Sequence, residues 1–406
     1  MSPSQLRCLK KAFTYSVQAS YSTNVNLASK SEKPLFNLLG RGESEVGDLV
    51  SKEYPKFRLF QTKQILNWIY SKGVMNFQAM TNLEPGLRKH LEDNFCVDYG
   101  RIETEQRSVD GTIKRLIEYG IPENKAKGLV EAVLITENNR RTLCVSSQIG
   151  CSLNCTFCHT GTQKLLRNLT SGEILGQYMG YLHLLGGFPA DPQNRKISNI
   201  VFMGQGEPLL NHRNVFSAIK TLTSPQGLSF PSKRITVSTS GVVPVIPRLA
   251  ELGVNLAVSL HAVNDELRNQ IVPLNKQFSI HTLLDACKAF VAASPPTTQR
   301  VTFEYVMLKD INDSTREARE LVRLLHGLPA HVNLIPFNPW PGCDYECSNE
   351  EQIKEFAKIV SSKNIYTTIR YSKGQDIMAA CGQLKSLNMS KAKRTPTNAI
   401  QKANLA

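Results

Sequence analysis

Three cysteines close together in the sequence constrain this chain more than any other feature. Cys151, Cys155 and Cys158 have the spacing C-x3-C-x2-C within the segment GCSLNCTFCHT. A cubic iron–sulfur cluster is usually held by four cysteine thiolates. If only three thiolates hold it, the fourth iron has no cysteine ligand and can bind and activate a substrate. A zinc site with His159 as fourth ligand is the alternative, although zinc more often uses pairs of C-x2-C. The spacing therefore predicts a metal centre, with an iron–sulfur cluster favoured over zinc.

Length and composition fit a globular enzyme with reduced cysteines. A chain of 406 residues suggests two domains, or one large α/β domain with additions. No apolar run approaches the length that crosses a bilayer. Ten cysteines are too sparse for a disulfide scaffold, and thiolate ligation needs reduced sulfur. We therefore expect a reducing compartment and no membrane partner.

Positive charge is concentrated at the two ends of the chain. The formal net charge is +14, of which residues 1–31 carry +4 and the basic tail, residues 385–406, carries +5, with no acidic residue in either segment. Solubilising surface lysine and a binding site for a polyanion such as RNA both explain this balance. Composition leaves the two interpretations open.

The first 31 residues have the character of a targeting segment. Basic residues alternate with Leu6, Leu9 and Phe13 at near-helical spacing, and the long apolar centre of a secretory signal is missing. We expect residues 1–31 to be a transit peptide or a disordered tail. A transit peptide would place the protein in an organellar matrix, with the mitochondrion favoured over the plastid or the cytoplasm.

Residues 32–100 are predicted to form a small helical accessory domain. Ile65, Trp68 and Ile69 share one face of a helix that stops near Gly73. A second helix is expected over residues 87–95. Such a unit could bind RNA or simply pack against the main domain, and the sequence does not choose between these roles.

Strand patterns follow the helical unit and define a main domain over residues 101–384. Residues 112–119 and 129–136 predict a β-hairpin extension. After it strands alternate with helices, one of which, over residues 173–185, begins at a capping-box pattern. Six such units predict an α/β fold, an incomplete parallel (β/α)6 barrel. The six predicted strands are residues 142–147, 197–203, 235–240, 256–260, 302–308 and 332–336.

Polar residues recur at the carboxyl ends of these predicted strands, where parallel sheets gather their chemistry. Glu207, after the second strand, can accept hydrogen bonds from an ammonium group. Taken singly, such residues are more often turn or capping residues, but their recurrence at successive strand ends predicts a binding site. The other members are Ser238, Ser259, His261 and Asn338, with Glu131 on the hairpin.

These segments together resemble one family, the RlmN/Cfr group of radical S-adenosylmethionine (SAM) RNA adenosine methyltransferases. The resemblance covers residues 35–384. It implies a radical-SAM catalytic domain, one [4Fe-4S] cluster on Cys151, Cys155 and Cys158, and SAM bound at the open iron. SAM contacts are implied for Gly206, Glu207, Ser238, Ser259, Leu260, His261 and Asn338. The segments that carry the resemblance are residues 142–158, 167–170, 206–208, 238–241, 259–261, 338–342 and 374–384.

The resemblance also implies roles for two cysteines that would otherwise pass for inert buried thiols. In the family, the cysteine matching Cys381 carries a methyl group as S-methylcysteine, and the one matching Cys144 later forms a transient disulfide with it. The C2 carbon of adenine is electron-poor and cannot attack an electrophilic methyl group, so a carbon radical formed on the S-methyl group adds instead. Glu131, the family's proposed proton acceptor, or Cys144 is expected to take the ring proton.

The resemblance implies methylation at C2 of an adenosine in large-subunit ribosomal RNA, with transfer RNA as a second substrate and two SAM molecules used per turnover. We also expect an electron donor for the cluster, a reductant for the disulfide and a monomeric protein. Three alternatives stay open: a C8-methylating enzyme of the same family, an RNA-binding assembly factor with a structural cluster, and a radical-SAM enzyme for a small molecule. Cys343 and Cys347, which the family pattern does not require, are expected to be surface thiols.

Overall fold

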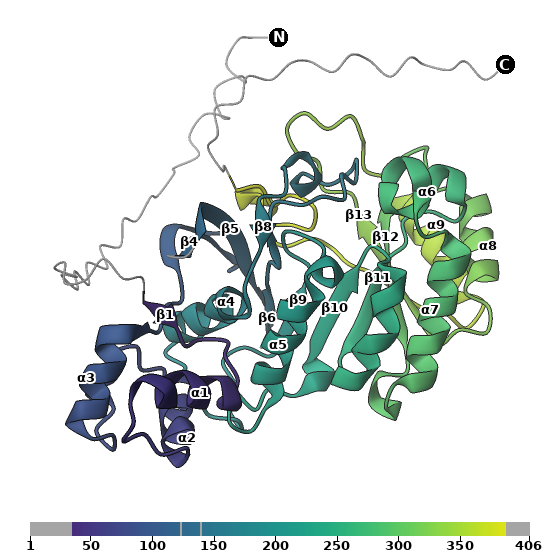
Figure 1. Ribbon diagram of the computed structural model, residues 1–406. Coiled ribbons are helices and arrows are strands. Elements are labelled where there is room, and N and C mark those ends of the chain that lie inside the picture. The colour runs from purple at the N-terminus through teal and green to yellow at the C-terminus, as the bar shows by residue number, and fades with distance from the viewer. Residues whose placement is uncertain (1–34, 122–123, 139, 387–406) are drawn as a thin grey trace, which may run out of the picture. The chain divides into compact units, whose positions relative to one another are not determined.

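A ten-stranded mixed sheet forms the centre of the part of the chain that the computed structural model describes, residues 35–121, 124–138 and 140–386 (Figure 1). Its antiparallel end consists of β3 (Arg101–Arg107), β4 (Ile113–Ile121) and β5 (Asn124–Glu137). The parallel strands are β6 (Arg140–Cys144), β9 (Asn199–Phe202), β10 (Ile235–Thr239), β11 (Asn255–Ser259), β12 (Val301–Met307), β13 (Ala330–Pro336) and β14 (Tyr366–Ile369). The order is β14-β13-β12-β11-β10-β9-β6-β5-β4-β3, so within the described residues the sheet is an open, incomplete barrel.

The parallel strands confirm the predicted α/β barrel, with one strand more than expected. Each of the six predicted strands matches one observed strand, from β6 to β13. β12 is buried along almost its whole length, as expected for a parallel strand covered on both faces. β14 was missed because it has four residues, none of them fully buried, so its hydrophobic signal is weak.

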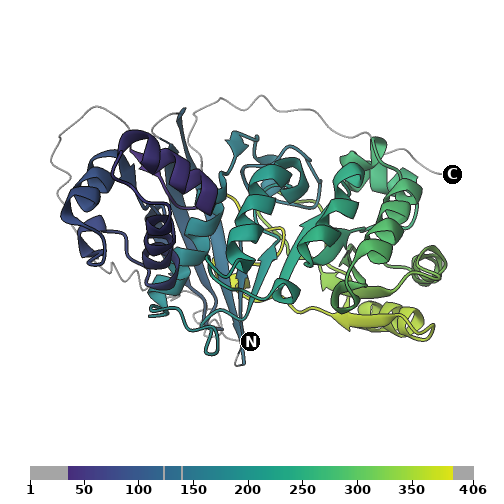
Figure 2. The same ribbon diagram turned by 60° about the horizontal axis from the view of Figure 1, so that its bottom comes forward.

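Helices connect the parallel strands, and Figure 2 shows them following one another in chain order beside the sheet. They are α4 (Ser171–Leu184), α5 (His212–Thr223), α6 (Asp265–Ile271), α7 (Ile280–Ala293), α8 (Thr315–Leu324) and α9 (Glu350–Ser361). The predicted capping box opens α4: Thr170 accepts from the Glu173 N–H, and the Glu173 carboxylate accepts from the Thr170 N–H at 2.8 Å. α4 is buried along most of its length, and its Tyr181 hydroxyl contacts the carbonyl oxygens of Ile113 on β4 and Ala132 on β5.

The N-terminal unit contains both predicted helices and one more. The elements are β1 (Phe36–Asn37), α1 (Glu43–Glu53), α2 (Phe60–Leu66), the π-helical turn η1 (Asn67–Ser71), α3 (Pro85–Asn94) and β2 (Phe95–Cys96). Ile65 and Ile69 are buried in a hydrophobic core that continues into the main domain. α1 and the pairing of β1 with β2 were not predicted. The boundaries at residues 32 and 100 stay predictions.

The predicted hairpin is β4 with β5, and β3 adds a third strand to it. β3 was missed because all seven of its residues are exposed, which removes the alternation that marks a half-buried strand. The extension continues the main sheet, since β5 pairs with β6 and places Val133 opposite Cys144.

Two predictions fall partly or wholly outside the described residues. The transit peptide of residues 1–31 lies outside them, and only residues 385 and 386 of the basic tail lie inside. None of the helices within the described ranges has the length and apolar character needed to cross a bilayer.

Candidate active site

The carboxyl ends of the parallel strands border one pocket, which collects most of the predicted site residues. Its empty space, counted out to the open mouth, is about 1010 Å³. Leu260, Cys144 and Glu131 lie outside the lining, and all three are buried. The predicted residues that line the pocket are Cys151, Cys155, Cys158, Gly206, Glu207, Ser238, Ser259, His261, Asn338 and Cys381.

Three of these residues lie on a single loop, residues 150–166, which we call the cluster loop. It connects two short paired strands, β7 (Gln148–Ile149) and β8 (Arg167–Asn168). Burial raises the pKa of each cysteine thiol on the loop, that of Cys151 to about 12. Repulsion between neighbouring sulfurs acts in the same direction for Cys151 and Cys155. Thiolates at these positions therefore need a bound cationic centre to displace their protons.

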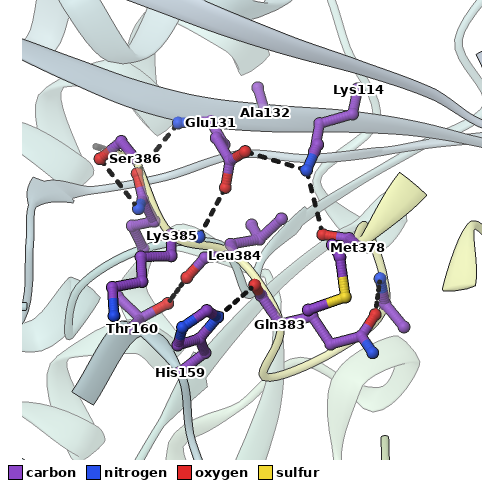
Figure 3. A network of polar contacts seen from close by, with 12 residues as sticks. Lys114, Glu131, Ala132, His159, Thr160, Met378, Gln383, Leu384, Lys385 and Ser386 are labelled. Carbon is purple, nitrogen blue, oxygen red and sulfur yellow. Dashed lines mark hydrogen bonds and ion pairs between the residues drawn. The ribbon is translucent and has the colours of Figure 1, made fainter. Parts of the chain in front are cut away.

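The arrangement of the donors fits an iron–sulfur cluster better than zinc. Within the described ranges, no three His, Cys, Asp or Glu side chains lie close enough together to hold a single metal ion, whereas zinc needs ligands about 2.3 Å from one point. His159, the alternative fourth ligand, stacks on Trp340 with ring centroids 4.6 Å apart. Its Nδ1 lies 3.2 Å from the Gln383 carbonyl oxygen (Figure 3). Three soft sulfur donors match an iron–sulfur cluster.

Glu207 is a buried carboxylate held in place by backbone groups. Its side chain accepts from the Leu209 N–H at 3.0 Å and from the Ser240 N–H at 2.8 Å. Burial raises the pKa of Glu207 to about 7, although these hydrogen bonds oppose the shift. Gly206 allows the tight approach, since its φ is +91° and a Cβ there would lie 2.4 Å from the Gln148 Cβ. The carboxylate is therefore suited to a cationic partner such as an ammonium group.

Arg268, which was not predicted from the sequence, organises two neighbouring strand ends. Its guanidinium is 1% exposed and donates to the carbonyl oxygens of Ser240, Ser259 and Leu260 at 2.7, 2.9 and 2.9 Å. These carbonyls lie at the carboxyl ends of β10 and β11, so one side chain connects the two strand ends. The Leu260 carbonyl also accepts from the Ala262 N–H at 2.8 Å. Leu260 is fully buried behind the pocket lining, and its carbonyl is occupied by Arg268.

His261 is a neutral imidazole with a defined tautomer. Its Nδ1 accepts from the Val306 N–H at 3.0 Å, so the ring proton is on Nε2. Burial lowers the pKa of His261 to about 3. The residue lines the pocket and packs edge-on against Phe157 of the cluster loop. It can therefore donate one hydrogen bond into the pocket without carrying charge.

Cys381 lies on the segment of residues 374–386, which we call the Cys381 segment. The backbone N–H of His159 donates to the Gly382 carbonyl at 2.7 Å, which joins this segment to the cluster loop. Asn338, after β13, donates to the Cys381 carbonyl at 3.2 Å. Upstream, the Gly374 N–H donates to Asp110 at 2.8 Å. The segment is therefore fixed across the pocket by groups from several distant parts of the sequence.

The fold brings Cys144 next to Cys381. Cys144 ends β6 and packs with Ala379 and Leu384, which flank Cys381 in the sequence. Burial, and then the proximity of the Cys381 sulfur, raise the pKa of Cys144 to about 12. Both thiols are free.

Two further charged residues of the pocket were missed by the sequence. Arg370 directly follows β14, and the nearby sulfur of Cys381 is the largest influence that raises its pKa. Glu304 on β12 also faces Arg370, and burial raises the pKa of its carboxyl group. Arg370 occupies a strand end like the predicted residues, but its strand was itself not predicted.

Glu131 lies against the Cys381 segment rather than in the pocket lining. Its Oε1 is 3.0 Å from Lys114 Nζ, and its Oε2 accepts from the Lys385 N–H at 2.7 Å (Figure 3). Sequence reasoning paired Glu131 with the chemistry and did not single out Lys114.

Two family models match this chain. The model described as the radical SAM superfamily matches residues 145–322. The model described as the ribosomal RNA large subunit methyltransferase N-terminal domain matches residues 36–97.

Similar proteins cover most of the chain. A dual-specificity RNA methyltransferase RlmN from Beijerinckia indica is 50% identical over 87% of this chain and 93% of its own. A protein of the same name from Parvibaculum lavamentivorans is 53% identical over 80% of this chain and 82% of its own. The crystal structure of a radical SAM methyltransferase from Sphaerobacter thermophilus is 39% identical, covers 86% of this chain and 98% of its own, and has a TM-score of 0.78.

These relatives correct one prediction from the sequence. The relatives named RlmN are bacterial proteins, made in cells that have no mitochondrial or plastid matrix. The expectation of an organellar matrix location is therefore wrong. A basic stretch interleaved with apolar residues was too weak a signal to support it.

Proposed function

We propose that this chain, which belongs to the RlmN family of radical-SAM RNA methyltransferases, methylates C2 of an adenosine in large-subunit ribosomal RNA and in transfer RNA. One observation carries this function: a single pocket joins the three cysteines of the cluster loop to Cys381, with Cys144 packed against the flanks of Cys381. The relatives' name, dual-specificity RNA methyltransferase, supports more than one kind of RNA substrate.

The enzyme uses one [4Fe-4S] cluster and SAM. We assign the cluster to Cys151, Cys155 and Cys158, whose buried sulfurs form one side of the pocket. When bound, the cluster and SAM supply the one-electron chemistry that activates an otherwise inert methyl group. An external electron donor is needed for that step.

The SAM contacts follow from the pocket lining. Glu207 would hold the ammonium group, because its buried carboxylate gains a cation there. Nε2 of His261 would donate to a ribose or carboxylate oxygen. The hydroxyl, amide and backbone groups of Gly206, Ser238, Ser259 and Asn338, which line the pocket, would complete the contacts. The family resemblance adds Leu260, which lies outside the lining.

Cys381 and Cys144 form the relay that moves the methyl carbon. The Cys381 sulfur takes a methyl group from one SAM and loses its proton, and the Arg370 guanidinium lies close to that sulfur. After the carbon has bonded to the base, the Cys144 sulfur attacks the Cys381 sulfur. That attack forms a disulfide and breaks the sulfur–carbon bond, whose electron pair stays on the carbon. The carbon takes a proton to become the methyl group of the base, and an external dithiol then reduces the disulfide with two electrons.

Two candidates can take the ring proton from the base, Cys144 and Glu131, and neither lines the pocket. Cys144 packs against both flanks of Cys381, but burial raises the pKa of its thiol to about 12, so it must first lose its own proton. Both carboxylate oxygens of Glu131 contact Lys114 and the Lys385 backbone.

We propose three parts of the chain: a helical accessory domain of residues 32–100, a catalytic domain of residues 101–384 with its β extension, and a basic tail of residues 385–406. The accessory domain and the basic tail would serve RNA binding. The net charge of +14 favours a polyanion and implies binding that weakens with salt. The protein would act as a monomer. Its target would be an unpaired adenosine, because the base must reach the catalytic sulfur inside the pocket.

The test is an anaerobic reaction of the cluster-loaded enzyme with SAM, a reductant and protein-free ribosomal or transfer RNA. Nuclease digestion and mass spectrometry then identify the methylated nucleoside. We expect 2-methyladenosine from both RNAs with wild type and none with Cys381→Ala. A product of 8-methyladenosine would indicate the other branch of the family. Conversion of SAM to 5′-deoxyadenosine without RNA methylation would favour a small-molecule substrate, and no conversion would favour an assembly factor.

A further inference from the structure

A buried ion pair touches the Cys381 segment at two points. Lys114 on β4 and Glu131 on β5 lie 3.0 Å apart, and their side chains are only 9% and 8% exposed. Lys114 Nζ also donates to the Met378 carbonyl at 3.2 Å, before Cys381. Glu131 Oε2 accepts from the Lys385 N–H at 2.7 Å, after Cys381 (Figure 3). One ion pair therefore connects the two ends of the run that carries the catalytic sulfur.

Stability alone does not explain a pair in this position. Burying both charges carries a large desolvation cost, and replacing such a pair by apolar side chains is often neutral or stabilising. Hydrogen bonds from charged groups to backbone are, however, about twice as strong as neutral ones and hold a fixed geometry. The pair is thus better suited to fixing the position of the backbone than to stabilising the fold.

The segment needs such fixing because regular structure does not hold it. Met378 and Gly382 have left-handed backbone, with φ of 54° and 79°, on either side of Cys381. The run between them belongs to no strand or helix in the described part of the chain. Its position therefore depends on contacts with neighbouring elements.

Those contacts also set the distance to Cys144. Glu131 lies on β5, and on the same strand Val133 pairs with Cys144 of β6. A rigid antiparallel ladder thus links the ion pair to the second sulfur of the relay. Movement of the Cys381 segment away from the ion pair would be movement away from Cys144.

We propose that Lys114 and Glu131 form a clasp that positions Cys381 against Cys144. Both are then positioning residues, and Glu131 acts through the backbone of the Cys381 segment rather than on the base. The consequence for turnover rests on the function proposed above, but the clasp itself can be measured without RNA.

The test compares Lys114→Met with two matched variants in the full-length, cluster-loaded enzyme. Lys114→Arg keeps the charge. Arg115→Met removes the next cation on β4, which is equally buried but contacts Glu105 and the Gly180 carbonyl on the opposite face of the sheet. Anaerobic hydrogen–deuterium exchange followed by mass spectrometry reports the protection of peptides that cover residues 379–386.

We expect Lys114→Met to speed exchange in residues 379–386 by roughly tenfold or more, and Lys114→Arg to restore most of the protection. With RNA as substrate, kcat should fall roughly tenfold to a hundredfold in Lys114→Met at an unchanged KM, since a small misplacement of reacting groups has that effect. Wild-type exchange in Lys114→Met, or an equal loss of protection in Arg115→Met, would overturn the clasp.

Glu131→Gln keeps the test decisive if Lys114→Met does not fold. Glutamine has the same shape and retains one acceptor, but it removes the charge that binds Lys114. Faster exchange in residues 379–386 supports the clasp, whereas lower kcat with wild-type exchange would identify Glu131 as a proton acceptor and overturn it. If wild type fails to methylate RNA, the proposed function fails, and the exchange data still decide the clasp.

Discussion

The cluster loop and the Cys381 segment differ in how their reactive groups are brought together. The cluster loop carries all three of its thiols on one short loop closed by the pairing of β7 with β8. The Cys381 segment depends on groups from β4, β5, the cluster loop and the loop after β13. One half of the site is therefore local in sequence, and the other exists only when the fold is complete. Substitutions in the cluster loop should therefore abolish SAM cleavage, whereas substitutions in the Cys381 segment should affect methyl transfer alone.

The largest expected effect is that separation itself. Cys155→Ala should abolish both the conversion of SAM to 5′-deoxyadenosine and RNA methylation. Cys381→Ala should reduce RNA methylation by about 10³-fold or more, since groups that act as a unit fail together, while the cluster still forms. Visible absorption of the cluster, 5′-deoxyadenosine yield and methylated nucleoside are measured on the same samples. Retained RNA methylation in Cys381→Ala would remove the basis for treating the segment as reactive.

Arg370 offers a second way to weaken only the Cys381 segment. Its charge opposes the burial that raises the pKa of Cys144 to about 12, so its loss should leave still less Cys144 thiolate. Arg370→Met is therefore expected to slow formation of the Cys144–Cys381 disulfide by about tenfold, because the thiolate is the attacking species. Mass spectrometry of rapidly quenched, alkylated enzyme after one turnover gives this rate.

The control for Arg370→Met is Arg115→Met, which removes a buried cation that contacts Glu105 and the Gly180 carbonyl. Equal slowing in the two variants would mean that lost stability, and not charge beside the sulfurs, is responsible.

Glu207 lines the same pocket as the cluster loop and Cys381, and it should make SAM binding depend on pH. Burial raises the pKa of Glu207 to about 7, so below that pH the acid form must lose a proton before it can hold an ammonium group. SAM affinity is expected to fall by up to about tenfold for each pH unit below 7, and to level off above it. Equilibrium dialysis of the cluster-loaded enzyme between pH 5.5 and about 8 checks this range.

Glu207→Gln should bind SAM more weakly at pH 8, which is about one unit above the wild-type transition, and show no such slope. A slope that survives in this variant would assign the titration to another group.

The same division explains what the sequence could and could not predict. Hydrophobic periodicity predicted six parallel strands, and the ends of those strands supplied the SAM-site candidates, because both signals are local. Arg370 was missed together with its short strand, β14.

Lys114 was missed for a different physical reason. In an alternating strand one face is usually solvated, so the neighbours Lys114 and Arg115 could not both be predicted as buried. Both are buried because α4 covers one face of β4, where Arg115 donates to the Gly180 carbonyl, and the Cys381 segment covers the other. No residue near position 114 in the sequence indicates that the Cys381 segment, which is distant in the sequence, packs over this face. Cys144 and Cys381 were paired from the family resemblance and not from their spacing.

The smallest expected effect comes from a contact that joins the two regions. Trp340 Nε1 donates to the Phe157 carbonyl of the cluster loop at 2.9 Å, while its ring stacks on His159. Trp340→Phe removes the donor and keeps an aromatic ring, so the loss should be that of one neutral hydrogen bond, about 0.5–1.5 kcal/mol. Because the three thiols are fixed within their own loop, we expect cluster content and 5′-deoxyadenosine yield to stay within about threefold of wild type.

Iron and sulfide analysis measures the cluster content of Trp340→Phe, and the thermal midpoint of the holoenzyme measures its loss of stability. A loss of cluster as complete as in Cys155→Ala would show that the loop, too, depends on distant parts of the fold, and the contrast between the two regions would not hold.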